Sequence, residues 1–133
     1  GPASNNDLDM LGELRDAALL GKLAADDASA VAAPTAVEMA TAAGADLLGF
    51  DSGRIEPGAN ADLTVIDLDV PHLAPRHDLV SHLVYAARGS DVRHTVCDGR
   101  VLLRDRELTT LDHDRVIREA NEHADALFAR AVE

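Results

Sequence analysis

The chain has 133 residues, enough for one ordinary domain, and its 47% apolar content excludes a disordered tail. Its formal net charge is -12, and no basic patch of the kind that binds nucleic acid is present. No apolar run approaches the ~18 residues that a membrane span needs. We therefore expect neither nucleic-acid binding nor membrane insertion. Cys97 is the sole cysteine, which excludes an internal disulfide and fits a cytoplasmic protein.

The basic residues are nearly all arginine, and Lys22 is the only lysine. An acidic excess with arginine preferred over lysine is typical of salt-adapted proteins, whose carboxylates hold water and counterions. The same composition is also found in acidic proteins from high-GC genomes. Both interpretations stay open on the sequence.

The first half of the chain predicts two helices. Apolar residues at helical spacing indicate a helix near 7–21, capped by Asn6 or Asp7 and stopped by Gly21. Residues 26–33 are expected to be a connector. A second helix is expected near 34–45, where Pro34 suits the first position because its missing N–H costs nothing there. This second tract is rich in alanine, which allows close approach to a neighbour.

The second half predicts strands and two more helices. Strands are expected near 61–68, 91–97 and 100–104, the first mostly buried, with a short helix near 78–87. Asp98-Gly99 predicts a type I′ hairpin turn, because both central residues of that turn need positive φ. Asp112 caps a last helix near 112–131 whose core-facing residues are expected to be Val116, Ile117, Ala120, Leu127 and Val132. About three strands cannot close a sheet, so we expect partner strands upstream in a longer protein.

Three segments resemble one family. Residues 1–10, GPASNNDLDM, resemble the segment after the last barrel strand of methylthioadenosine and S-adenosylhomocysteine deaminases. Residues 53–67 carry the pattern G-x-I-x-x-G-x-x-A-D-L-x-V-x-D that is widespread among amidohydrolases. Ser81 to Ala87, Gly89 to Val92 and the Asp98-Gly99 turn resemble the deaminase and chlorohydrolase branch, which includes N-ethylammeline and atrazine chlorohydrolases. The motifs do not separate deamination from dechlorination.

The resemblance implies an α/β fold, namely the C-terminal part of a (β/α)8 metal-dependent hydrolase barrel and the C-terminal strands of its small β-sandwich domain. Residues 1–50 would be the last barrel loop with barrel-covering helices, 51–110 part of the sandwich, and 111–133 a C-terminal helix. The function implied for the whole protein is hydrolytic deamination or dechlorination of a purine nucleoside or a triazine-like heteroaromatic. The resemblance also implies a small-molecule partner and a cytoplasmic enzyme, and the open surfaces of the fragment favour a homo-oligomer.

In that family the barrel binds zinc or iron, and the metal activates a water molecule. The resemblance implies that the metal-binding aspartate stands immediately before Gly1. No catalytic or metal-binding residue is therefore expected in this chain, and we expect the fragment alone to be inactive and to bind no catalytic metal. Ser4, Asn5 and Asn6 would lie beside the metal pocket as an active-site loop. His82 lies in a family-like segment and is a possible pocket-side residue, although a structural role joining barrel and sheet is favoured.

The remaining polar residues favour structural roles. The six histidines lack metal-ligand spacing. Four aspartates stand at predicted strand ends and turns, where backbone hydrogen bonding or solvation is expected: Asp62, Asp67, Asp69 and Asp91. Cys97 is expected to be a small core residue. Two alternative functions stay open: another amidohydrolase branch, such as guanine deaminase or imidazolonepropionase, and a stand-alone non-enzymatic binding or scaffold domain.

Overall fold

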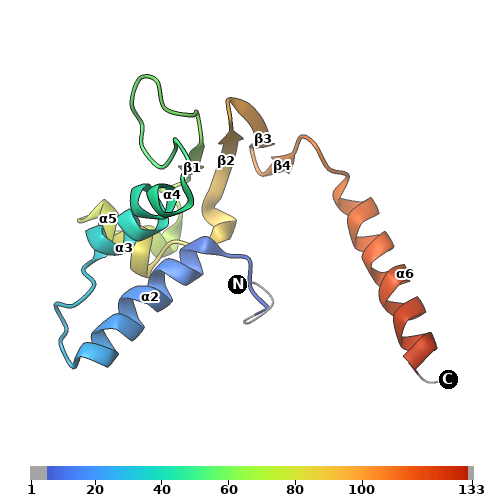
Figure 1. Cartoon of the computed structure of the whole chain (residues 1–133), viewed down its shortest axis with the longest axis horizontal. Coiled ribbons are helices and arrows are strands. Elements are labelled where there is room, and N and C mark those ends of the chain that lie inside the picture. Colours follow the sequence, from blue (N-terminus) through green and yellow to red (C-terminus); the bar gives the residue numbers. More distant parts are fainter. Residues whose placement is uncertain (1–5, 132–133) are drawn as a thin grey trace.

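A computed structural model describes residues 6–131 of the chain. Four helices pack beside a small sheet, and a last helix extends away from them (Figure 1). In chain order the elements are α2 (Met10–Ala25), α3 (Ala33–Ala40), α4 (Ala42–Leu48), β1 (Leu63–Ile66), η1 (Pro71–Leu73), α5 (Leu79–Tyr85), η2 (Gly89–Asp91), β2 (Val92–Cys97), β3 (Arg100–Arg104), β4 (Glu107–Leu108) and α6 (His113–Ala131).

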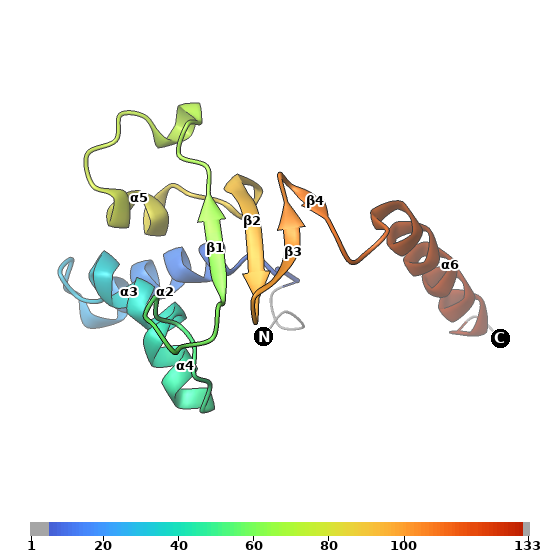
Figure 2. The ribbon, with the colours of Figure 1, turned by 90° about the horizontal axis from the view of Figure 1, so that it is seen from above.

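The sheet is antiparallel with the strand order β1-β2-β3-β4, and it lies between the helical body and α6 (Figure 2). The predicted hairpin turn is confirmed: Asp98 and Gly99 join β2 to β3 with φ values of 48° and 72°. A second tight turn, at Asp105 and Arg106, joins β3 to the two-residue strand β4. The sequence analysis did not predict β4, because neither Asp105 nor Arg106 is a glycine.

Strand β1 is shorter and more exposed than expected. It spans four residues where the sequence predicted a mostly buried strand over 61–68, and Val65 is 48% exposed. The register between β1 and β2 shifts at Val65/Ile66, which shortens the regular pairing. The first of these strands also lies at one edge of the sheet, so one of its sides has no neighbouring strand among the described residues.

Helix α2 differs from the prediction at both ends. Its N-cap is Asp9 rather than Asn6 or Asp7, because the Asp9 carboxylate accepts a hydrogen bond from the backbone N–H of Leu11 at 2.9 Å. The helix continues through Gly21 to Ala25, so Gly21 is not a stop. Gly21 instead lies where the chain approaches Val31 closely.

The expected helix over 34–45 is broken into α3 and α4 at Thr41. This residue has φ -124° and ψ -99°. Its backbone N–H donates to the carbonyl oxygen of Glu38, three residues back, whereas a regular α-helix uses the carbonyl oxygen four residues back. The glycine at position 53 lies against the break: a Cβ on Gly53 would be 2.6 Å from the carbonyl oxygen of Thr41. The chain therefore returns toward the sheet directly beside the interruption.

The core is helical and built largely from small side chains. Leu11, Leu14 and Ala18 of α2 pack with Ala33 and Ala36 of α3, and the cluster is completed by Leu73, Val84 and Ala87. Ala18 and Ala36 have no exposed surface, which confirms the close approach that the alanine-rich tract predicted. Partly buried sheet residues such as Ile66 and Val92 cover this cluster.

Helix α6 corrects a prediction. Its cap is as expected, since Asp112 accepts from the N–H of Arg115. Its apolar residues, however, do not face the core: Val116 and Ile117 are each 49% exposed and Leu127 is 58% exposed. Figure 1 shows the reason, because the helix projects away from the other described elements of the molecule. Ala120 is exposed as well, and Val132 lies outside the described residues.

Candidate functional site

The start of α2 is the part of the described chain nearest to the proposed active-site loop. Of the three residues predicted to form that loop, Ser4 and Asn5 lie outside the described residues. Asn6 is exposed and has a left-handed backbone with φ 57°. The Asp7 carboxylate then accepts from the N–H of Asp9 at 2.9 Å.

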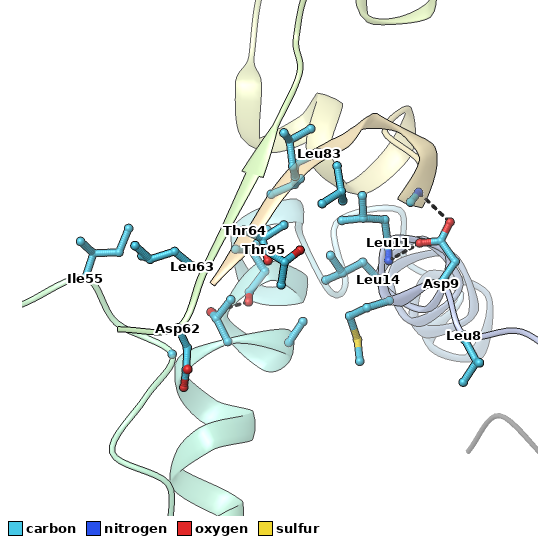
Figure 3. A pocket seen from close by; sticks show the side chains of 18 of the residues that line it. Leu8, Asp9, Leu11, Leu14, Ile55, Asp62, Leu63, Thr64, Leu83 and Thr95 are labelled. Carbon is cyan, nitrogen blue, oxygen red and sulfur yellow. Dashed lines mark hydrogen bonds between the residues drawn. The ribbon is translucent and has the colours of Figure 1, made fainter. Parts of the chain in front are cut away.

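Asp9 connects two distant parts of the chain. One carboxylate oxygen accepts from the N–H of Leu11, and the other accepts from the N–H of Gly89 at 2.8 Å, across 80 residues (Figure 3). Partial burial tends to raise the pKa of this carboxyl, but hydrogen bonds from the backbone N–H groups of Gly89, Leu11 and Gly12 outweigh it and lower the pKa below 3.8. Asp9 is therefore held ionised as a structural anion.

Arg15 extends this connection along the same face of α2. Its guanidinium donates to the carbonyl oxygens of Tyr85 and Ala87 at 3.2 and 2.9 Å. Together Asp9 and Arg15 bind three backbone groups of residues 85–89, which run from the last residue of α5 into η2. We call this set of contacts the α2 clamp.

A cavity of about 720 Å³ opens beside the clamp. Leu8, Leu11 and Leu14 form one wall, and Leu63, Thr64 and Thr95 of the sheet face them across the space (Figure 3). The walls are mainly apolar. The carboxylates at the rim, Asp9 and Asp62, are already engaged by hydrogen-bond donors, so the lining holds no free acid–base pair.

The acidic residues of the second motif have the structural roles that the sequence predicted. Asp62 accepts from the Ser52 hydroxyl at 2.6 Å and from the Asp98 N–H at 2.7 Å, which ties the start of β1 to the hairpin turn. These hydrogen bonds lower the pKa of Asp62. Asp67 likewise accepts from the Asp69 N–H and pairs with Arg106, and these contacts lower its pKa.

Asp91 is the one buried polar side chain among the residues with described exposure, with 3% of its surface accessible. A single carboxylate oxygen contacts His72 Nε2 at 2.8 Å and accepts from the Arg88 N–H at 2.9 Å. The backbone oxygen of Asp91 also accepts from the Asp67 N–H. Asp91 thus joins the loops at η1, η2 and the end of β1, as expected for a turn aspartate. Asp69, by contrast, has 96% of its side chain exposed and forms a surface ion pair with Arg76 at 3.6 Å.

His82 contacts backbone oxygens and does not line the cavity. Its Nδ1 lies 2.6 Å from Asp78 O and its Nε2 lies 3.0 Å from Pro75 O. The ring therefore connects the 75–78 loop to the first turn of α5. No three His, Cys, Asp or Glu side chains gather into a metal-binding group within the described residues 6–131. Cys97, which the sequence placed in the core, is exposed, because it ends β2 at the hairpin.

The family model for the amidohydrolase family matches residues 1–102, about three quarters of the chain. This chain belongs to the amidohydrolase family. The matched range contains the helical core, the cavity and strands β1 and β2, and it ends within β3. Helix α6 lies beyond it.

Individual relatives agree with this assignment. The amidohydrolase chain is 72% identical over 131 residues to a 5-methylthioadenosine/S-adenosylhomocysteine deaminase of Haloarcula marismortui, covering 98% of this chain and 30% of that protein. It is 65% identical to the protein of the same name from Halobacterium salinarum, covering 100% of this chain and 31% of that one. The chain thus spans under a third of the length of these curated relatives.

Solved structures share the fold. An adenosine deaminase from Xanthomonas campestris with bound zinc is 40% identical with a TM-score of 0.93, covering 97% of this chain and 30% of that one. An atrazine chlorohydrolase from Arthrobacter aurescens TC1, complexed with zinc, is 29% identical with a TM-score of 0.82, covering 92% and 28%. Both branches suggested by the sequence motifs are therefore represented among the structural neighbours.

The sequence analysis missed the clamp between Asp9 and Gly89. An aspartate directly before a helical pattern is a capping signal, so the bond to Leu11 was within reach of the sequence. Nothing local in the sequence indicates the second bond, because its donor is a backbone N–H 80 residues away. Only the packing of α2 on α5 brings the two together.

Proposed function

We propose that this chain is the C-terminal part of a metal-dependent aminohydrolase that deaminates the adenine ring of 5′-methylthioadenosine or S-adenosylhomocysteine. Water would replace the ring amino group with oxygen, and ammonia would leave. The observation that carries the proposal is the 72% identity to a relative named for this reaction, which extends over nearly the whole chain.

The proposed division of the whole enzyme follows the motifs. Residues 1–50 would contain the last barrel loop and barrel-covering helices, 51–110 part of a small β-sandwich domain, and 111–133 a C-terminal helix. The break at Thr41 and the return of the chain at Gly53 support a boundary near residue 50, because the character of the backbone changes there from helix to turn and strand. In this arrangement the β1 edge would pair with strands from elsewhere in the enzyme.

The metal of the whole enzyme would be zinc or iron, and zinc is supported by the two zinc-bound neighbours. The metal would supply an activated water for attack on the ring. The described residues of this chain do not fit a metal site, since they bring no three ligand-type side chains together. We therefore assign the ligands to other parts of the enzyme, including an aspartate immediately before Gly1.

The role proposed for this chain is to form one side of the active site and to support it. Ser4, Asn5 and Asn6 would lie beside the metal pocket and contact the substrate. His82 would fasten the loop at Pro75 to α5 through its two backbone contacts. A homo-oligomer in the cytoplasm is the expected state of the whole enzyme, and the single cysteine of this chain is in line with the cytoplasm.

The decisive experiment uses the protein encoded by the complete reading frame. The purified zinc protein is incubated with 5′-methylthioadenosine, S-adenosylhomocysteine, adenosine and atrazine, while ammonia and chloride are measured separately. We expect ammonia from the first two substrates at a higher kcat/KM than from adenosine, and no chloride from atrazine. Chloride release would instead support the chlorohydrolase branch, which the second structural neighbour represents. An absence of both products would overturn the proposal.

A further inference from the structure

The α2 clamp joins the two motif regions that are furthest apart in the chain. Asp9 belongs to the first family-like segment and Gly89 to the third, and their contact is a 2.8 Å hydrogen bond between a carboxylate and a backbone N–H. Arg15 holds the same segment at Tyr85 O and Ala87 O. The segment that leads away from Asn6 is thus fastened to the turn that begins β2.

The local fit at Gly89 is tight. A Cβ at this position would lie 3.1 Å from both Cγ and Oδ1 of Asp9 and 3.2 Å from Oδ2, tighter than most real Cβ contacts. A side chain at position 89 would therefore push the carboxylate away from the backbone N–H by a few tenths of an ångström. The contact depends on two features: position 9 carries an aspartate, and position 89 carries no side chain.

Asp9 has more acceptors than a helix cap needs. One oxygen is enough to cap the first turn of α2, and Leu11 uses it. The second oxygen is committed to Gly89, outside the helix. An asparagine could keep the cap with its single amide oxygen, but its NH2 group would face the Gly89 donor and could not accept from it. The two roles of Asp9 can therefore be separated by one substitution.

We infer that Asp9 is a positioning residue, which fixes the start of α2 against the η2 turn and thereby sets the place of Asn6, three residues before it. This inference rests on the proposed function, because it takes Asn6 as part of the active-site loop. Asp9 itself would touch no reacting atom. Its effect on catalysis passes through the placement of its neighbours, and a displacement of about 1 Å can cost ~100-fold in rate.

The test compares the complete enzyme with its Asp9→Asn, Gly89→Ala and double variants. Asp27→Asn is the matched control, since Asp27 also accepts a backbone N–H two residues ahead and has its pKa lowered by hydrogen bonds from Ser29, but it lies at the other end of α2. For Asp9→Asn we expect kcat for 5′-methylthioadenosine to fall about 10- to 100-fold, with KM changed less than about 3-fold. Zinc content and Tm should match those of the control.

The double variant distinguishes a shared contact from two separate defects. If Asp9 and Gly89 act through one hydrogen bond, adding Gly89→Ala to Asp9→Asn should lower kcat no further. Additive losses would overturn the inference, as would a kcat equal to that of Asp27→Asn, or a loss that tracks a lower Tm or zinc content. A wild-type enzyme without deaminase activity would overturn the proposed function itself, and the positioning role with it.

Discussion

A Cβ placed on Gly21 would lie 2.4 Å from Cγ2 of Val31, which is closer than any real contact. Gly21 lies inside α2, where alanine would normally be preferred by about 1 kcal/mol. Val31 cannot easily yield, because it is a β-branched residue held at φ 43°. The glycine is thus required by the close approach of the turn at residues 26–32, and the helix itself would favour alanine at this position.

Two glycines of the same helix should respond in opposite ways to substitution by alanine. Gly21→Ala should destabilise the chain by about 1–2 kcal/mol, because overpacking exceeds the gain in helix propensity. Gly12→Ala should stabilise it by about 0.5–1 kcal/mol, since the nearest atom to its Cβ would be 3.5 Å away. Urea unfolding followed by circular dichroism measures both. Adding Val31→Ala to Gly21→Ala should restore stability, and a failure to do so would refute the steric explanation.

Lys22 should be a large single contributor to the helical body. Its ammonium donates to Ala30 O, Val31 O and the Tyr85 hydroxyl at 2.8–2.9 Å and lies 5.5 Å from the centre of the Tyr85 ring. Lys22→Met keeps the aliphatic stem and removes all three donors, so we expect a loss of about 1–2 kcal/mol in the free energy of unfolding. Tyr85→Phe should cost less than about 1 kcal/mol, because the lysine keeps both carbonyl partners. Equal losses would show that the ring hydroxyl is the main partner.

Local signals in the sequence predicted most elements, and long-range packing decided the exceptions. The Asp98-Gly99 turn and the strands on either side followed from turn chemistry and alternation. Gly21 was wrongly taken as a helix stop, because its neighbour Val31 becomes visible only in three dimensions. The break at Thr41 was missed for the same reason, since Gly53 packs against it from a later segment.

The sequence predicted only those parts of the candidate site that follow from local features or from the resemblance to a family. The aspartates of the second motif were correctly assigned to backbone contacts, because their positions at strand ends are a local feature. The direction of the α6 apolar face was wrong, because a helical pattern shows that a face exists and not what covers it. The bond between Asp9 and Gly89 could not be predicted at all, since backbone donors carry no sequence signal.

Acid should destabilise the chain through its hydrogen-bonded aspartates. The folded pKa of Asp62 is lowered by its bonds to Ser52 and Asp98, and that of Asp46 by its pair with Arg54. A carboxyl with a lowered folded pKa stabilises the fold above its unfolded pKa near 3.8 and loses this effect as pH falls through the folded value. The urea concentration at the unfolding midpoint should therefore decrease when the pH is lowered below about 4. The midpoint of Asp62→Asn should depend less on pH there, and an identical pH dependence would contradict the assignment.

The isolated chain of residues 1–133 should have no deaminase activity. Its described residues gather no metal-ligand group, and under the proposed function the metal-binding aspartate lies outside these residues. We expect no ammonia from 5′-methylthioadenosine and no zinc or iron retained after dialysis. Stoichiometric metal in the dialysed chain, detected by elemental analysis, would show that a ligand set had been overlooked. The complete enzyme, prepared in parallel, provides the positive control.

Apolar side chains left open to water should make the isolated chain self-associate. Leu8, Leu47 and Ile55 are 86–90% exposed, and the large apolar residues of α6, which projects away from the other described elements, are 49–68% exposed. Soluble monomers seldom tolerate large patches of this kind. The opposing force is the net charge of -12, which disfavours both compaction and close association.

Added salt should shift this balance toward folded oligomers. The Debye length falls from ~10 Å at 0.1 M to ~3 Å at 1 M, so repulsion between carboxylates is screened while apolar contacts persist. We expect the sedimentation coefficient and the helical circular dichroism signal to rise together across a salt series from about 0.1 to 1 M. Ile117→Glu, on the exposed face of α6, should reduce the association if that helix takes part, and Arg118→Glu provides a charge-changing control on the same helix. A compact and fully folded monomer at low salt would refute the prediction, because it would mean that the exposed apolar surface needs no partner.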